Sequence, residues 1–182
     1  MAVWTLIAHD SLSLPAATVA WSSIPASYDH LYIVASERNS NSALGTAPLL
    51  RVGNGSIDSG ANYSRTVLYW RIPDSLPSST RGTGDSSIQM LYGNNNSNVA
   101  GAFSGISVWI PHYASGYYKS MLVNIANVDE STSNYTQGQG LHAGLWQNTA
   151  AITDISITAD GGGGGDQHMA YSTFDLYGIT GA

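Results

Sequence analysis

Few side chains of this 182-residue chain could carry out acid–base chemistry. Glutamate occurs only at Glu37 and Glu130, and catalysis by paired carboxylates needs two acids at a fixed separation, one of them with a raised pKa. Most aspartates fall in turn-like sequence, where a short carboxylate caps backbone groups. Glu37 lies in a strand-like run beside Arg38, and we interpret it as half of an ion pair or as a charge on a solvated strand edge. We therefore predict no catalytic residue and no enzymatic activity.

The histidines lack the spacing of a metal site. They stand at His9, His30, His112, His142 and His168, without the HxH or HxxxH pattern that brings two imidazoles to one metal ion. The chain also lacks cysteine, a GxSxG nucleophile elbow and a calcium loop of alternating acids. We expect neither a metal nor a cofactor.

A glycine run at residues 161–165 is the remaining candidate for ligand binding. Glycines allow close approach to a phosphate, but a phosphate-binding loop also needs a Lys and a Ser or Thr after the turn, and then a helix. Here Asp166, Gln167 and His168 lead into another strand-like run. We interpret the glycines as the flexible tip of a hairpin between the two flanking strands.

The aromatic residues favour rings with a polar edge, since eleven tyrosines and five tryptophans stand against two phenylalanines. Such rings suit half-buried positions and interfaces. Trp70, Trp109 and Trp146 lie inside strand-like runs. We predict that these three tryptophans belong to the core.

Six residues are candidates for an interface. They are Arg65, Tyr69, Arg71, Tyr113, Tyr117 and Tyr118. The first three share one face of the alternating run Tyr63 to Ile72, and that face is either a solvated outer face or a contact surface. The three tyrosines surround the loop PHYASGYYK. They suit either homo-oligomer packing, which is the commoner use of such residues, or a sugar-binding platform.

Charge is scarce in the chain. Charged residues make up 10% of it, with 12 acidic and 6 basic side chains and a net charge of -6. No cluster of Lys and Arg provides the basic footprint that phosphate neutralisation needs, so we exclude nucleic acid as a partner. The N-terminal MAVWTLIAHDS lacks the basic start and long apolar core of a signal peptide, and no run has the length of a membrane span. We expect synthesis in the cytosol and no membrane partner.

Alternating and β-branched runs recur along the whole chain, whereas apolar residues at helical spacing do not. About ten strands are predicted from these runs. The runs are Val3 to His9, Ala17 to Trp21, Tyr28 to Arg38, Leu49 to Val52, Tyr63 to Ile72, Ser87 to Tyr92, Gly101 to Ile110, Tyr117 to Ile125, Leu141 to Trp146, Ile152 to Ala159 and Ser172 to Ile179.

The clearest alternation is in Tyr28 to Arg38, where Leu31, Ile33 and Ala35 share one face. Both faces of this run carry bulky residues, which indicates a strand inside a sheet with some cover on its outer side. The segment Pro73 to Asp85 is rich in Pro, Ser and Gly. We predict that it is a surface excursion without a strand.

The strand pattern predicts a single all-β domain over residues 1–182. A two-sheet antiparallel β-sandwich buries one face of each sheet, and the absence of an internal repeat excludes propellers and solenoids. The strand count favours a jelly roll over an immunoglobulin domain, whose Cys, Trp, Cys spacing is missing. We expect the first and last strands to be neighbours, with the last strand closing a sheet that begins much earlier.

Several segments together resemble a group of bacteriophage virion structural proteins, common among marine and cyanobacterial phages. They are SSIPASYDHLYIVASERNS, GNGSIDSGANYS, ISVWIPHYASGYYKSMLVNIAN, GLHAGLWQNTAAITDISITAD and STFDLYGI. The resemblance covers about Trp21 to Ile179, and its most specific parts are W-x-x-x-x-A-I-T-x-I-x-I from Trp146 and S-T-F-x-L-Y-G-I from Ser172. Both capsid decoration (cement) proteins and tail-associated proteins occur in this group.

The resemblance implies a jelly-roll sandwich, commonly trimeric, that does no chemistry. We expect a capsid decoration protein on the outer surface of the phage head, made in the host cytoplasm and bound to the major capsid protein. The alternative is a tail-fibre or spike module that recognises host surface glycan through exposed Tyr and Trp. An enzyme that degrades surface polysaccharide is the third alternative, which the scarcity of carboxylates disfavours.

Overall fold

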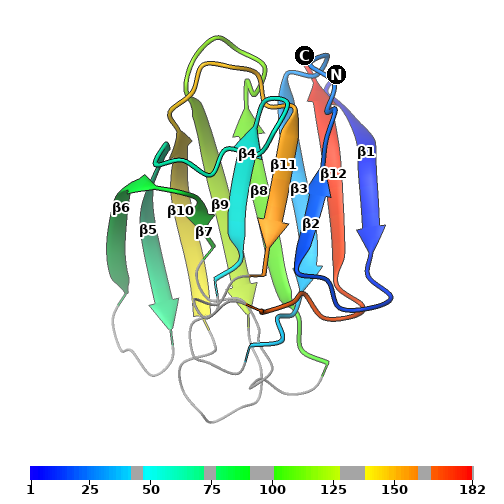
Figure 1. The fold of residues 1–182 in the computed structure, drawn as a ribbon, viewed down its shortest axis with the longest axis vertical. Helices are drawn as coiled ribbons and strands as arrows, with labels where there is room; N and C mark the ends of the chain where they lie inside the picture. Colours follow the sequence, from blue (N-terminus) through cyan, green and yellow to red (C-terminus); the bar gives the residue numbers. More distant parts are fainter. Residues whose placement is uncertain (42–46, 72–76, 91–100, 128–137, 160–164, 182) are drawn as a thin grey trace.

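The computed structural model describes residues 1–41, 47–71, 77–90, 101–127, 138–159 and 165–181. Within these residues the chain forms twelve β-strands in two antiparallel sheets, which face each other as the layers of a sandwich (Figure 1). The prediction of an all-β, two-sheet antiparallel sandwich is confirmed, with twelve strands in place of about ten.

The larger sheet contains eight strands in the spatial order β1 (Val3–Ser11), β12 (Thr173–Thr180), β3 (His30–Glu37), β8 (Ser104–Pro111), β9 (Lys119–Asn127), β10 (Gly138–Trp146), β5 (Tyr63–Arg71) and β6 (Ser78–Asp85). The smaller sheet contains four strands in the order β2 (Thr18–Trp21), β11 (Asp154–Thr158), β4 (Leu49–Gly53) and β7 (Ile88–Gln89).

Eight of the strands follow the jelly-roll order. The succession β1, β12, β3, β8 in the larger sheet is matched by the succession β2, β11, β4, β7 in the smaller one. The other strands, β5 and β6 together with β9 and β10, extend the larger sheet beyond β8. The larger sheet therefore has twice as many strands as the sheet that packs against it.

The last strand closes the larger sheet, as the sequence predicts. β12 lies between β1 and β3 and pairs with both, so the first and last strands are neighbours. The ring of Tyr28 lies against Gly178 of β12, where an added Cβ would come within 2.4 Å of that ring. Glycine is required at this position because the ring packs directly on the backbone.

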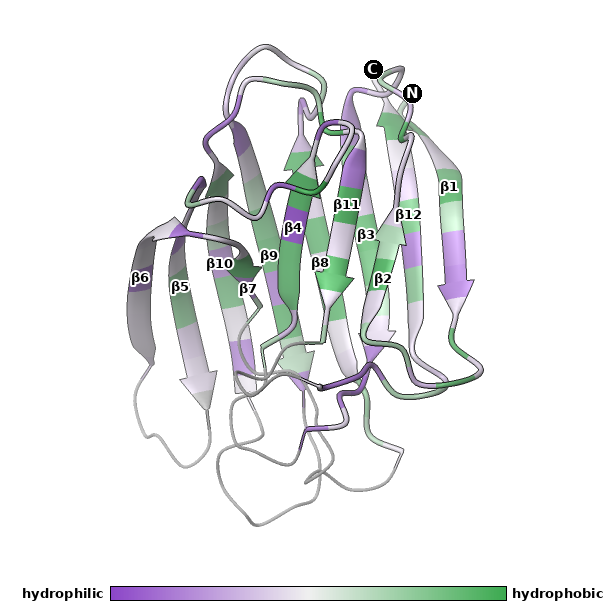
Figure 2. Cartoon of the chain, in the orientation of Figure 1, coloured by the Kyte–Doolittle hydropathy of each residue, from purple (hydrophilic) through white to green (hydrophobic). Residues whose placement is uncertain are grey.

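The core lies between the two sheets and follows the period-two pattern of the sequence. On β3 the inward residues are Leu31, Ile33 and Ala35, as the alternation predicts. On β9 every second residue from Lys119 to Asn127 is buried. Figure 2 shows alternating hydrophobic and hydrophilic bands along β12, whereas β4 is hydrophobic apart from one hydrophilic band.

The prediction of a strandless excursion at Pro73 to Asp85 is wrong, because β6 occupies Ser78–Asp85. β6 pairs with β5 at the edge of the larger sheet. Its sequence, SSTRGTGD, contains no large apolar side chain, and backbone hydrogen bonds with β5 provide the pairing. A strand of this kind lacks the alternating apolar residues by which a strand is predicted from sequence.

The interpretation of the glycine run as a hairpin tip is also wrong. The flanking strands β11 and β12 belong to different sheets, so the segment between them is a crossover and not a hairpin. Gly161 to Gly164 themselves lie outside the described residues. The sequence predicts both strands but not their assignment to sheets, because that assignment depends on partners distant in the chain.

Tyr63 joins the two sheets through its hydroxyl group. The ring is fully buried, and the hydroxyl accepts the N–H of Val52 on β4 at 3.0 Å. The same oxygen lies 2.9 Å from the carbonyl oxygens of Val52 and Asp58, to one of which it donates. Burial raises the pKa of Tyr63 to about 12, so the phenol keeps the proton that it donates.

Replacing Tyr63 by Phe should lower the free energy of unfolding by about 1–3 kcal/mol, because it leaves buried backbone groups unpaired. Urea denaturation of the Tyr63→Phe variant measures this change. Tyr118→Phe is the matched control, since Tyr118 is exposed and its hydroxyl is solvated. Equal stability of the two variants would contradict the role assigned to Tyr63.

Candidate interaction surfaces

The outward side of the larger sheet carries an extended apolar surface, which we call the outer face. Its large exposed apolar side chains are Trp4, Leu6, Val34, Leu68, Trp70, Trp109, Leu122 and Leu141. Each of them is between 38% and 55% exposed. Monomeric proteins rarely expose large contiguous apolar patches, and such a patch usually marks an interaction site.

Strand register makes the outer face continuous. A central row runs across six strands through Leu6, Tyr177, Tyr32, Trp109, Leu122 and Ala143, each paired with the next. At one end of this row the ring of Trp4 packs edge-on against Tyr32 and Tyr177, at centroid distances of 5.1 and 6.0 Å. The row therefore joins β1 to β10 as one apolar band.

Charge on the outer face is confined to its two edges. At one edge His9 of β1 and Asp175 of β12 form a pair, with 2.5 Å between Nδ1 and Oδ1. At the other edge Arg81 of β6 is exposed. The five strands between these edges are β3, β8, β9, β10 and β5. Among their described residues, no Asp, Glu, Lys or Arg occupies an outward position.

The prediction of a core position is wrong for Trp70 and Trp109, which lie on the outer face. It is confirmed for Trp146, which is buried and donates its Nε1–H to Asp58 Oδ2 at 2.8 Å. Alternation in a strand shows which residues share a face but not which face points inward. On β5 the inward face is the one that carries Val67, which is fully buried.

The candidate interface residues Arg65 and Tyr69 of β5 lie on the inward side of the strand. Arg65 and Tyr69 lie on the same side as Val67 and are only partly accessible. Arg65 Nη1 pairs with Asp85 Oδ2 of β6 at 3.0 Å. The backbone of Arg71 pairs with Gly138, and its side chain lies outside the described residues. The outward residues of β5 are instead Thr66, Leu68 and Trp70, on the side opposite to Arg65 and Tyr69.

Tyr113 is not a surface residue, contrary to the prediction. It is fully buried, and its hydroxyl donates to the carbonyl oxygen of Pro25 and accepts the N–H of Tyr28 at 3.4 Å. Burial raises the pKa of Tyr113. The residue thus ties the loop after β8 to the segment that leads into β3.

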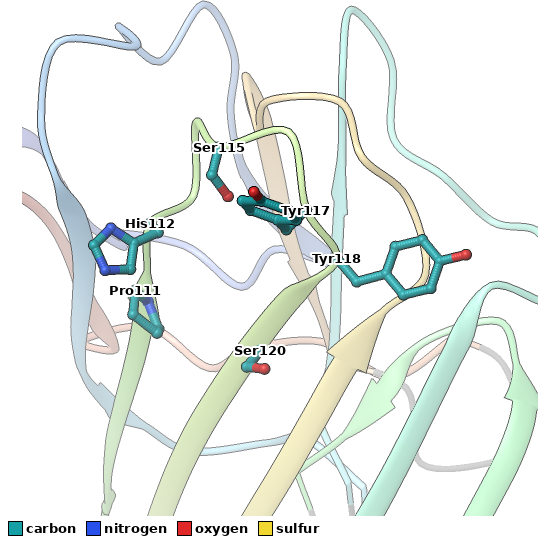
Figure 3. Close-up of a pocket in the computed structure, with 6 residues that line it drawn as sticks. All are labelled: Pro111, His112, Ser115, Tyr117, Tyr118 and Ser120. Carbon is teal, nitrogen blue, oxygen red and sulfur yellow. The ribbon is translucent and has the colours of Figure 1, made fainter.

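Tyr117 and Tyr118 are exposed, as predicted, and they border a pocket beside the outer face. The pocket has a volume of about 390 Å³ and is lined by Pro111, His112, Ser115, Tyr117, Tyr118 and Ser120. Figure 3 shows His112 and Tyr118 on opposite sides of it, with Ser120 between them on β9. Two phenol rings, an imidazole and two serine hydroxyl groups line it, and none of the six lining residues is Asp, Glu, Lys or Arg.

Lys119 holds the loop that carries these tyrosines. Its side chain is fully buried and its Nζ donates to the carbonyl oxygens of Ser115 at 2.8 Å, Thr149 at 3.3 Å and Tyr117. Burial lowers the pKa of this ammonium group. The role of Lys119 was not predicted from the sequence, although a lysine at an inward position of the β9 alternation is a signal of a buried, hydrogen-bonded ammonium group.

Glu37 and His168 form a buried pair. Both side chains are fully inaccessible, and Glu37 Oε1 lies 2.9 Å from His168 Nδ1. His168 Nε2 donates to the carbonyl oxygen of Ile157 at 3.0 Å, so one proton is held between Oε1 and Nδ1. Burial raises the pKa of Glu37, and the interaction with His168 opposes that rise. Glu37 thus has His168 as its partner, and the solvated-edge interpretation is wrong because the Glu37 side chain is sealed from solvent.

The described residues contain no group of three or more His, Cys, Asp or Glu side chains placed to hold a metal ion. No helix in the described part of the chain is long and apolar enough to cross a membrane. The sequence matches no protein-family model and no curated protein.

Acid should destabilise the fold through His142. This side chain is fully inaccessible on β10, and burial, with the positive charge of Arg65 nearby, lowers its pKa from 6.5 to about 4. As the pH falls from 6.5 to 4, His142 binds a proton in the unfolded chain but not in the folded chain. This difference lowers the free energy of unfolding by about 3 kcal/mol at pH 4 relative to pH 7.

The test compares urea denaturation at both pH values for the native chain and for His142→Leu, which cannot titrate. His142→Leu should lose about 3 kcal/mol less on acidification. His112→Asn is the control, because the side chain of His112 is exposed, and it should follow the native pH dependence. Identical acid sensitivity of all three proteins would contradict the assignment.

Proposed function

We propose that this protein is a non-enzymatic virion structural protein that decorates the outside of a phage head. In this role it binds the major capsid protein as a homotrimer and stabilises the assembled shell. The observation that carries the proposal is the outer face, where eight large apolar side chains are exposed on one sheet. A surface of this kind suits a protein that works inside an assembly.

Burial of the outer face would provide favourable free energy without any reaction. Full burial of one large apolar side chain contributes about 1.5–3 kcal/mol. The side chains of the outer face are about half exposed, so burying the rest of their surface in a contact would contribute part of this free energy. Many identical copies on one shell add these contributions through multivalency. A protein that binds only the assembled shell stabilises it by mass action.

The distribution of charge supports the same proposal. Apolar contact is screened by salt much less than pairing of exposed charges. Because the centre of the outer face carries no charged side chain among the described residues, an assembly held together through it would persist at high ionic strength. Persistence in salt suits a protein that must stay on a virion outside the cell.

Removal of the protein should lower the temperature at which heads release their DNA, because the shell loses binding energy specific to its assembled state. Release is measured by dye fluorescence during a thermal ramp of heads with and without the protein. Re-addition of the purified chain to depleted heads is the control and should restore the release temperature. An unchanged release temperature would contradict the proposal.

A second candidate function is recognition of host surface glycan by a tail fibre or spike. The observation that favours it is the pocket between His112 and Tyr118, where exposed rings and hydroxyl groups meet. Aromatic faces pack against the apolar face of a sugar ring, while hydroxyl groups bond to its edge. Immunogold labelling separates the two functions, since decoration places label over the head and a tail module places it on the tail.

Substituting both Tyr117 and Tyr118 by Ala should abolish binding to host cells or glycan arrays if the second function holds. Tyr171→Ala is the matched control, because Tyr171 is equally exposed but lies in the segment before β12. Retained glycan binding by the double variant would exclude the pocket as the binding site.

A further inference from the structure

The larger sheet has cover on one side only. The smaller sheet packs against its inner side, whereas the outer face remains bare in the described part of the chain. The alternation of β3 predicts cover on both sides, yet Val34 on its outer side is 41% exposed. The described part of the chain does not supply cover for this side.

The size of the outer face matches a specific protein interface. Its strands have eight or nine residues each, and a rise of about 3.3 Å per residue with a strand spacing of about 4.8 Å gives an area of about 900 Å² for eight strands. A standard interface buries about 800 Å² per partner. Complete burial therefore needs a partner with a flat apolar face of similar size.

A second copy of this chain has that face, and its charge distribution permits the contact. The chain carries a net charge of -6, which opposes self-association at a random surface. Of the 12 acidic residues, Asp175 alone stands at an outward position on the described strands of the larger sheet. The outer face is thus the part of this acidic protein where two copies meet with the least repulsion.

The edge charges define the direction of packing. A two-fold axis parallel to the strands brings the β6 edge of one copy to the β1 edge of the other, so that Arg81 lies at the edge that carries the His9–Asp175 pair. An axis perpendicular to the strands would place like edges together, with Arg81 against Arg81 and Asp175 against Asp175. Opposite charges favour the first arrangement and like charges disfavour the second.

We propose that the outer face is buried against the same face of a second copy of this chain, about a two-fold axis parallel to the strands, which places the Arg81 edge of one copy at the Asp175 edge of the other. This contact joins copies in pairs, and the three copies of the proposed function are a separate proposal. The face and the direction of packing come from the register and the charges of the larger sheet.

The first test introduces a charge at the centre of the outer face. Trp109→Lys and Leu122→Lys change adjacent residues of the central row, and each should weaken association at least about thirtyfold, as loss of an interface hot spot does. Leu14→Lys is the matched control, since Leu14 is exposed between β1 and β2, away from the larger sheet. Sedimentation velocity gives the oligomeric state, and circular dichroism confirms that each variant is folded.

An oligomeric native chain, an oligomeric Leu14→Lys variant and monomeric Trp109→Lys and Leu122→Lys variants would support the proposal. A monomeric native chain, or variants that remain oligomeric, would overturn it. If the native chain is monomeric but Trp109→Lys abolishes binding to heads, the outer face belongs to the capsid contact and decoration still stands. If Trp109→Lys disrupts the oligomer but immunogold labelling detects none of this protein on virions, the proposed function is contradicted and the proposed interface is retained.

The second test concerns the direction of packing. Arg81→Glu and Asp175→Lys should each weaken association about two- to fivefold, in the range of exposed ion pairs. The double variant restores opposite charges and should recover most of the native affinity at low salt. A double variant that associates no better than the weaker single variant would overturn the parallel axis.

Discussion

The pleat of the larger sheet sends successive side chains to opposite sides, and the smaller sheet packs against one of those sides only. The outward side chains of its eight strands are therefore not covered by the smaller sheet. An uncovered side is ordinary when it is polar. Here it carries three tryptophans and five aliphatic side chains at partial exposure, which makes the outer face the dominant surface feature of the protein.

Some of the scarce charged side chains of the chain are buried inside it. Lys119 donates to three backbone carbonyl groups, Glu37 pairs with His168, and both sites are sealed from solvent. Buried polar groups must be hydrogen-bonded to be tolerated, and these bonds tie loops and separate strands into one structure. The polarity of the molecule is thus partly inverted, with ionic groups in the interior and aromatic rings at the surface. This inversion favours a role in assembly.

Much of the fold could be predicted from alternation. The inward face of β3 and the alternating burial of β9 follow directly from the pattern of Leu31, Ile33 and Ala35 and from that of Met121 and Val123. β6 was missed because a strand of Ser, Thr and Gly has no apolar period to detect. Of the candidate interface residues, Tyr117 and Tyr118 are exposed, but Tyr113 is buried, because a tyrosine in a loop sequence carries no signal of what packs over it.

The sequence by itself determined the fold class, because β-branched and alternating runs without helical periodicity leave a two-sheet sandwich as the way to bury one face of each strand. Only the tertiary structure decided which face of each strand is inward, since period-two alternation is symmetric between the two faces until a second layer packs against one of them. That choice turned Trp70 and Trp109 outward and Arg65 inward. The outer face is therefore a property of the assembled sheets and not of any single strand.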